Sequence, residues 1–254
     1  MKIIDGHVNV SETGRWFDTG LDASYQRVED SLYEAGISNA MLIAMPGACS
    51  NSFFSSGQVN RSKYWCIGNI DLEDWKFSVD EIRDLDLDGV FIHPRYQGFS
   101  LESLLCSDLL SSLEDHNLPI VICGWTQSES VPIESLSPLW IDKIAKKHKN
   151  LRILLAHLGG HRYWDAFMAA RSNQNVYLDC SYFLDVFRDT SLEADFFASL
   201  RLIDQKVIFG SDFPEIDPAA YSSRFIDQIS RIREVDVSRL LSENIQDFMH
   251  RALT

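Results

Sequence analysis

The chain has 254 residues, 45% of them hydrophobic and 24% charged, a composition that supports a sizeable core and excludes a disordered chain. A formal net charge of −14 argues against nucleic acids and anionic membranes as partners, because both repel a negatively charged protein. Five cysteines without CxxC spacing, no signal peptide and no apolar run of membrane-spanning length together favour a cytoplasmic protein without disulfides.

Strands and helices are predicted to alternate along the whole chain. Short apolar, partly β-branched runs predict eight strands, at residues 2–10, 39–45, 64–70, 88–93, 119–123, 151–157, 175–180 and 206–209. Apolar residues at helical spacing predict helices at 23–35, 77–85, 101–116, 134–148, 162–171, 192–203, 218–233 and 237–253. Several strands are continuous apolar runs, as expected when both faces of a parallel sheet are buried.

This alternation predicts an α/β fold, a (β/α)₈ TIM barrel, with residues 1–254 forming a single domain. No linker, low-complexity run or internal repeat divides the chain. A doubly wound open sheet is the alternative, but no glycine-rich phosphate loop follows the first strand.

Polar and aromatic side chains follow many of the predicted strands. Polar or aromatic residues stand at or just beyond the strand ends: His7 and Asn9 at the first, His93 and Arg95 at the fourth, Cys123 and Trp125 at the fifth, His157 and His161 at the sixth, and Asp212 at the eighth. In a barrel these strand ends meet at one mouth, where barrel enzymes keep their chemistry. Any one of these residues has a structural explanation as well, but His, Cys and Asp at one mouth suit a divalent metal.

Three motifs carry a family resemblance. Ile4-Asp5-Gly6-His7, Leu155-Ala156-His157-Leu158-Gly159-Gly160 and Phe209-Gly210-Ser211-Asp212-Phe213-Pro214 resemble the amidohydrolase superfamily, and especially the amidohydrolase-related branch that includes aminocarboxymuconate semialdehyde decarboxylase. Leu240-Leu241-Ser242-Glu243-Asn244-Ile245 is similar to the last helix of that branch. The resemblance implies one divalent metal ion, with Zn²⁺ expected, held by a first-strand His-x-His, a fifth-strand His and an eighth-strand Asp. A sixth-strand His lies beside the metal.

Two of the implied metal positions differ from the family pattern. His7 and Asp212 match it, and His157 matches the sixth-strand His, but Asn9 and Cys123 stand where the family has histidines. An amide oxygen binds Zn²⁺ weakly, whereas cysteine is a strong ligand as a thiolate and a small core residue as a thiol. His7, Asn9, Cys123 and Asp212 are thus the predicted metal positions, with retention and loss of the metal both open.

The leading functional hypothesis is a metal-dependent hydrolase of a C–N or C–O bond in a small molecule. Asp212 would act as general base toward a metal-activated water, and His157 would polarise the substrate carbonyl. Non-oxidative decarboxylation, metal-free acid–base catalysis by His157 and Asp212, and a catalytically degenerate barrel that binds a metabolite or a protein stay open as alternatives.

Four residues near the strand ends are predicted to bind substrate: His93, Arg95, Trp125 and His161. Aromatic walls with a guanidinium suit a flat acid whose carboxylate pairs with the arginine. The same residues could instead roof the barrel or form surface ion pairs. The expected partner is therefore a small-molecule carboxylate, and a homo-oligomer is left open.

Overall fold

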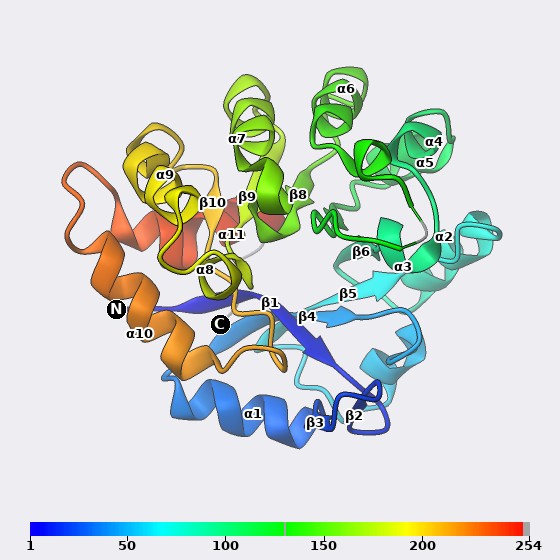
Figure 1. Cartoon of the computed structure of the whole chain (residues 1–254). Helices are drawn as coiled ribbons and strands as arrows, with labels where there is room; N and C mark the ends of the chain where they lie inside the picture. The colour runs from blue at the N-terminus through cyan, green and yellow to red at the C-terminus, as the bar shows by residue number, and fades with distance from the viewer. Residues whose placement is uncertain (130, 251–254) are drawn as a thin grey trace.

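The computed structural model describes residues 1–129 and 131–250. Eight parallel strands follow one another in chain order around a nearly closed barrel, with helices between them (Figure 1). They are β1 (Ile4–Val10), β4 (Asn39–Ala44), β5 (Tyr64–Asn69), β6 (Gly89–Ile92), β7 (Ile120–Ile122), β8 (Ile153–Leu155), β9 (Val176–Asp179) and β10 (Val207–Ile208). The predicted single-domain (β/α)₈ barrel is confirmed. A separate two-stranded hairpin, β2 (Arg15–Trp16) and β3 (Leu21–Asp22), follows β1 and was not predicted.

Helices connect the strands on the outside of the barrel. The α-helices are α1 (Tyr25–Glu34), α2 (Trp75–Asp84), α3 (Pro94–Gln97), α4 (Leu101–Leu105), α5 (Leu109–Asp115), α6 (Leu139–Lys147), α7 (Tyr163–Ser172), α8 (Phe183–Val186), α9 (Ser191–Ser199), α10 (Pro218–Ile229) and α11 (Asn244–Met249). Short 3-10 turns cover Asn51–Ser55, Ile133–Leu136 and Leu200–Leu202, and a π-helical turn covers Arg239–Glu243. Among the described residues, no helix is both long and apolar enough to cross a membrane.

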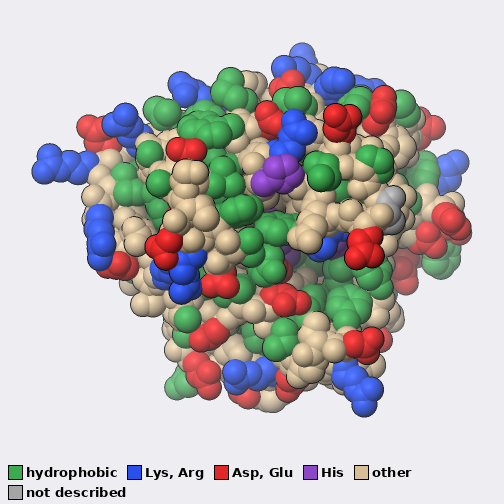
Figure 2. All heavy atoms as spheres, in the orientation of Figure 1, with side chains coloured by type: hydrophobic (Ala, Val, Ile, Leu, Met, Phe, Trp, Pro, Cys, Tyr) green, Lys and Arg blue, Asp and Glu red, His purple; other side chains and the backbone are tan. Residues whose placement is uncertain are grey.

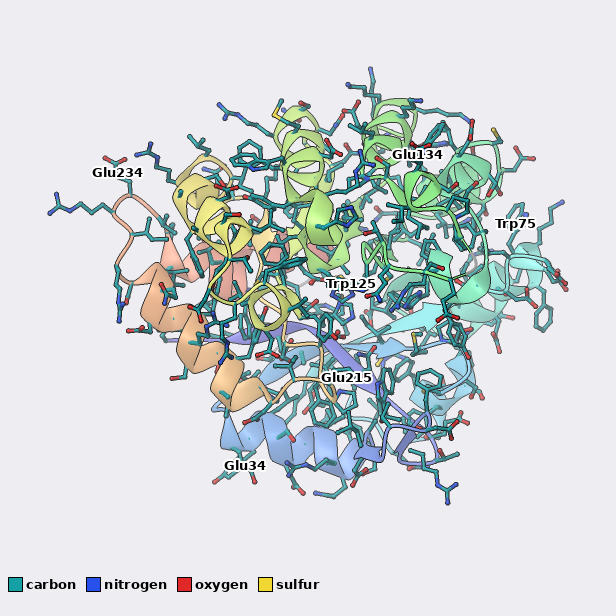
Figure 3. The ribbon with its side chains drawn as sticks, viewed as in Figure 1. Glu34, Trp75, Trp125, Glu134, Glu215 and Glu234 are labelled. Atoms are coloured by element: carbon teal, nitrogen blue, oxygen red, sulfur yellow. The ribbon has the colours of Figure 1, made fainter. Side chains whose placement is uncertain are left out.

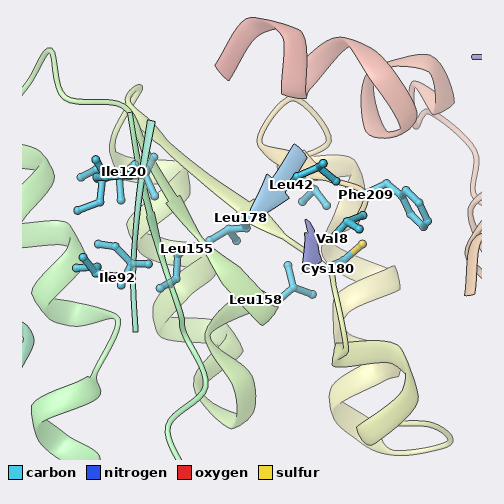
Figure 4. Close-up of a cluster of buried hydrophobic side chains, with 14 of the residues drawn as sticks. Val8, Leu42, Ile92, Ile120, Leu155, Leu158, Leu178, Cys180 and Phe209 are labelled. Atoms are coloured by element: carbon cyan, nitrogen blue, oxygen red, sulfur yellow. The ribbon is translucent and has the colours of Figure 1, made fainter. Parts of the chain in front are cut away.

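Two separate cores lie on the two sides of the sheet, because side chains along a strand alternate in direction. In β4, Leu42 packs toward the helices, and Met41 and Ile43 point into the barrel. In β7, Ile120 and Ile122 face outward, and Val121 faces inward. Figure 4 shows part of the outer core. Cys123 continues the alternation and belongs to the inner core, so its thiol lies inside the barrel.

The barrel closes where β1 meets the segment after β10. Gly6 N donates to Phe209 O at 2.8 Å, and Asp212 N donates to His7 O at 2.9 Å. Gly6 and Gly210 lie along this seam, and neither position leaves room for a side chain. A Cβ at Gly6 would lie 2.5 Å from Ile208 Cγ2, and one at Gly210 would lie 2.9 Å from His7 Cβ. Two glycines therefore allow the first strand and the last to approach closely.

Two predicted helices are interrupted. The helix expected at 101–116 is divided into α4 and α5, because Ser107 Oγ accepts a hydrogen bond from Leu109 N and so starts a new helix. The helix expected at 134–148 begins only at Leu139, directly after Pro138, whose ring favours a helix start. Of the helix expected at 237–253, residues 251–253 lie outside the described part of the chain.

Candidate active site

A cavity of about 900 Å³ opens among the residues that follow the strands. Its polar lining consists of His7, Asn9, His93, Arg95, Gln127, Ser128, Glu129, His157, Asp212 and Glu215, and its apolar and aromatic lining of Trp16, Phe17, Met45, Phe91, Tyr96, Trp125, Tyr182 and Val186. Trp125 and Glu215 lie near the middle of the view in Figure 3. In the same orientation, hydrophobic side chains gather around the middle of the surface (Figure 2).

His7 lies between two carboxylates. Its Nδ1 donates to Asp179 Oδ2 at 2.9 Å, and its Nε2 lies 3.4 Å from Asp212 Oδ1. Both His7 and Asp179 are buried. Burial alone would lower the pKa of His7, but the charge and hydrogen bond of Asp179 and the charge of Asp212 raise it above its ordinary value. The same contact with His7 keeps the pKa of Asp179 low despite burial, which would raise it. The contact therefore favours the charged form of each group.

Asp212 is fixed in place by its neighbours. Asn9 Nδ2 donates to Asp212 Oδ1 at 2.9 Å and to Phe213 O at 3.0 Å. Asp212 has a positive φ of 74°, a conformation that is uncommon for a residue with a side chain. Glycine is the residue that adopts such a φ most easily, but here the position is occupied by Asp212. The carboxylate of Asp212 therefore lies at the wall of the cavity.

His157 is oriented from behind by the residues after β9. Its Nδ1 lies 3.1 Å from Ser181 O and 3.0 Å from Ser181 Oγ, and its backbone N donates to Asp179 Oδ1 at 3.2 Å. Ser181 Oγ in turn donates to Asp179 Oδ1. One buried carboxylate, Asp179, thus holds both His7 and the loop that carries His157.

The charge on His157 is stabilised by the groups around it. Burial lowers the pKa of His157, but the hydrogen bond with Cys123 and the negative charges of Asp212, Cys123 and Asp179 raise it to about 10. Burial raises the pKa of the Cys123 thiol, but His93 and His157 outweigh burial and bring that pKa well below its ordinary value. The imidazolium form of His157 is therefore favoured at neutral pH.

Asp5 lies beneath these residues. Its Oδ1 accepts hydrogen bonds from His7 N at 3.1 Å and Ser211 N at 2.9 Å, whereas its buried Oδ2 has no partner among the described residues. Burial raises the pKa of Asp5 to about 6, even though its hydrogen bonds lower it. The carboxyl group joins β1 to the loop that carries Asp212.

The structure brings most of the predicted site residues to one cavity. His7, Asn9, His93, Arg95, Trp125, His157 and Asp212 all line it. Cys123 and His161 are not among its lining residues. His161 is exposed and its Nδ1 bonds Thr126 Oγ1 at 2.7 Å, so its side chain is engaged outside the cavity.

Sequence reasoning missed Asp179 and Ser181 as site residues. Asp179 is the last residue of β9 and Ser181 follows it, so their position at the mouth could have been inferred from the barrel alone. No sequence signal shows that Asp179 reaches His7, because the two residues are 172 positions apart. Tyr182 and Glu215 also line the cavity, and the side chain of Glu215 is held by Trp16 Nε1 at 2.7 Å.

A comparison with protein families matches residues 70–249 to the amidohydrolase family, which is more than half of the chain. The chain belongs to the amidohydrolase family. A search of curated protein sequences finds no match.

Solved structures of similar fold cover nearly the whole chain. An uncharacterized TIM-barrel protein from Bordetella bronchiseptica has a TM-score of 0.82 at 17% identity, covering 99% of this chain and 100% of that one. A candidate 2-pyrone-4,6-dicarboxylic acid hydrolase from Acinetobacter baumannii, with citric acid bound, has a TM-score of 0.71 at 15% identity, with 99% and 100% covered. A 2,6-dihydroxybenzoate decarboxylase from Rhizobium has a TM-score of 0.68 at 14% identity, with 98% and 99% covered. At these identities the likeness establishes the fold.

Amidohydrolases typically hold a divalent metal ion, but the donor set of this chain does not fit one. Across residues 1–129 and 131–250, no group of three or more His, Cys, Asp or Glu side chains is placed to hold a metal. His7 and Asp212 approach each other, but Asn9 turns its Nδ2, a hydrogen-bond donor, toward the same oxygen of Asp212. Cys123 belongs to the inner core, is only 4% exposed and does not line the cavity. The expected set of His7, Asn9, Cys123 and Asp212 therefore does not form a metal centre.

Proposed function

We propose that this amidohydrolase hydrolyses a C–O or C–N bond of a small, flat carboxylic acid through acid–base catalysis by Asp212 and His157. The observation that carries the proposal is the pairing, at one cavity wall, of a fixed carboxylate with a charged imidazole. Groups of opposite protonation state at one site are what general acid–base catalysis needs.

Asp212 is suited to act as the base. Its Oδ1 already accepts a hydrogen bond from Asn9 and lies near His7 Nε2, which leaves the other carboxylate oxygen for a water molecule. Removal of a proton from that water generates the nucleophile that attacks the substrate carbonyl.

His157 is suited to act as the acid. As an imidazolium it can donate a hydrogen bond to the carbonyl oxygen as negative charge develops there, and it can then protonate the leaving group. Burial strengthens such a charge-assisted interaction, because little water competes for the donor.

Arg95 and the aromatic walls support a carboxylate substrate. The buried Nε of Arg95 has no hydrogen-bond partner among the described residues. Its Nη1 donates a long, weak hydrogen bond of 3.5 Å to Gln127 O. A substrate carboxylate would satisfy this donor bidentately. Trp125 and Tyr182, whose ring centroids are 5.2 Å apart, offer a face for a flat ring.

A screen of lactones, esters and amides of small aromatic and aliphatic acids tests the proposal, with acid release followed by a pH indicator. We expect turnover in the presence of a chelator. Replacement of the base by Asp212→Asn should lower kcat by about 100- to 10,000-fold. Asp227→Asn, which changes an exposed carboxylate paired with Arg231, is the matched control and should leave kcat unchanged.

Decarboxylation is assayed in parallel, because the related Rhizobium structure is a decarboxylase and the same acid could protonate a carbanion. If the protein releases carbon dioxide from aromatic acids and hydrolyses none of the substrates, the hydrolase proposal is wrong and the protein is a decarboxylase. Activity that disappears with chelator and returns with Zn²⁺ would show that a metal enters the site after all.

A further inference from the structure

Three aromatic rings stand in a row along one side of the cavity. The ring centroids of Trp16 and Phe17, both in the β2–β3 hairpin, are 5.0 Å apart, and those of Phe17 and Tyr96 are 5.7 Å apart. All three residues line the cavity, and we call them the aromatic rim. Because neighbouring rings are inclined by 65° and 47°, the rim is a curved wall rather than a flat stack.

The backbone next to the rim leaves room for its rings. A Cβ at Gly47, in the turn after β4, would lie 2.5 Å from Tyr96 Oη and 3.6 Å from Phe17 Cε1. Glycine at this position therefore lets both rings pack against the turn. Phe17 is still 37% exposed and Tyr96 53% exposed, so part of each ring surface is open to a ligand.

A carboxylate stands against the aromatic rim. Trp16 Nε1 donates to Glu215 Oε1 at 2.7 Å, and Glu215 itself lines the cavity (Figure 3). Among the described residues, the other carboxylate oxygen of Glu215 has no hydrogen-bond or ion-pair partner. The faces of aromatic rings attract cations, and a neighbouring carboxylate adds a full negative charge to that attraction. The rim and Glu215 together have the composition of a site for an organic cation.

Arg95 lies on the opposite side of the barrel mouth. It follows β6 and donates to Gln127 O after β7, whereas Glu215 follows β10 and Trp16 follows β1. In the strand order of the eight-stranded barrel, the pair β6–β7 is half a turn away from the pair β10–β1. A molecule that spans the mouth therefore meets a guanidinium at one side and a carboxylate at the other.

We propose that the aromatic rim and Glu215 bind an alkylated ammonium group of the substrate, whose carboxylate pairs with Arg95. The substrate is then a zwitterionic acid. A second carboxylate at the rim would face Glu215 and be repelled, which disfavours dicarboxylic acids. This inference rests on the proposed hydrolase function for the carboxylate and the reacting bond, and it adds the group at the far side of the cavity.

Calorimetric titration with choline and with its carbon isostere dimethylbutanol tests the ammonium site. The two alcohols have the same shape, and only choline carries a positive charge. Neither has a carboxylate or a bond to hydrolyse, so their binding does not depend on Arg95 or on turnover. We expect choline to bind about tenfold more tightly. Equal affinities, or no detectable binding of choline, would overturn the proposal.

Three variants assign the preference to the rim. Glu215→Gln should weaken choline binding by about tenfold and leave dimethylbutanol binding unchanged, because only the charge is removed. Phe17→Leu keeps an apolar side chain and removes a ring, so it should weaken choline binding by about threefold or more. Asp18→Asn is the matched control, because Asp18 is an exposed carboxylate of the same hairpin outside the cavity lining. A loss of choline binding in Asp18→Asn as large as that in Glu215→Gln would show a general effect of net charge and overturn the site.

The two proposals fail in different ways. If choline binds more tightly than dimethylbutanol but no ester, lactone or amide is turned over, the ammonium site is present and the hydrolase function is wrong. If a substrate is hydrolysed but choline has no advantage over dimethylbutanol, the hydrolase function stands and the ammonium site is wrong.

Discussion

At the scale of single residues, the candidate site depends on one buried carboxylate that never reaches the cavity lining. Asp179 is completely buried and uses Oδ2 for His7 and Oδ1 for the loop that carries His157. It therefore holds the His7 ring directly, and the His157 ring through Ser181. Asp179 is a positioning residue in this arrangement, because it touches the groups that act rather than the substrate.

Replacement of Asp179 by asparagine should reduce kcat by about 10- to 100-fold with little change in KM, because outer partners of functional histidines have effects of that size. An amide at this position cannot stabilise the His7 imidazolium. The alkaline limb of the pH profile of kcat should shift to lower pH, because the acid His157 loses one of the charges that raise its pKa. Steady-state kinetics across pH measure both effects. A variant whose kcat falls without any shift of the profile would indicate general loss of structure instead.

Replacement of Arg95 by glutamine should raise KM for a carboxylate substrate by about 10- to 100-fold, the effect expected when a charge-assisted hydrogen bond is lost. The methyl ester of the same carboxylate should show no such difference between parent and variant. Arg162→Gln is the matched control, because Arg162 pairs with Asp165 outside the cavity lining. Equal KM values for parent and Arg95→Gln would assign carboxylate binding to another group.

At the scale of elements, the sequence predicts the strands better than the helices. Several strands are buried on both faces and therefore appear as continuous apolar runs, as in Ile153–Leu155. Helix ends depend on local hydrogen bonds such as the one from Leu109 N to Ser107 Oγ, which competes with an apolar pattern that continues through the break. The pattern alone could not decide between one helix and two.

The site was predictable to the extent that it depends on strand ends. His7, His157 and Asp212 could be placed at one mouth, because parallel strands of a barrel end on the same side. The lowering of the Cys123 pKa by His93 and His157 could not be predicted, because it depends on the register of three neighbouring strands. Residue type allowed the thiol to be either a ligand or core packing, and in the structure Cys123 belongs to the inner core.

The seam between β1 and β10 is the element most sensitive to added volume. Gly210→Ala should destabilise the protein by about 3 kcal/mol, because its Cβ would overlap His7 Cβ and overpacking of a rigid site costs energy of that order. Gly57→Ala is the control: nothing lies within 4 Å of its Cβ, so only its positive φ costs energy, about 1 kcal/mol. Urea denaturation measures both. Equal effects would show that the seam can relax.

At the scale of the whole molecule, stability should depend on pH through Asp5. The folded-state pKa of about 6 lies above the ordinary value of 3.8, so the folded state binds the proton more tightly than the unfolded state does. The contribution of Asp5 is therefore fully present below pH 3.8 and is lost as the pH rises through about 6. On that account it amounts to about 3 kcal/mol at most.

Asp5→Asn removes this titration and keeps one oxygen for His7 N and Ser211 N. We expect the free energy of unfolding of the parent to fall between pH 5 and pH 8 relative to that of the variant, as measured by urea denaturation at each pH. Asp227→Asn, at an exposed position, should follow the parent at every pH. Parallel curves for the parent and Asp5→Asn would show that Asp5 is ionised in the folded protein.

The hydrogen bond from Asp212 N to His7 O, at 2.9 Å, has a dual character, because it is a closing contact of the barrel and joins two residues of the candidate site. Any opening of the seam must separate these two residues. The amide proton of Asp212 should therefore exchange with solvent only through the rarest opening events, at the rate set by global unfolding. Heat should accordingly inactivate the enzyme in a single step, with no folded but inactive form before the melting transition.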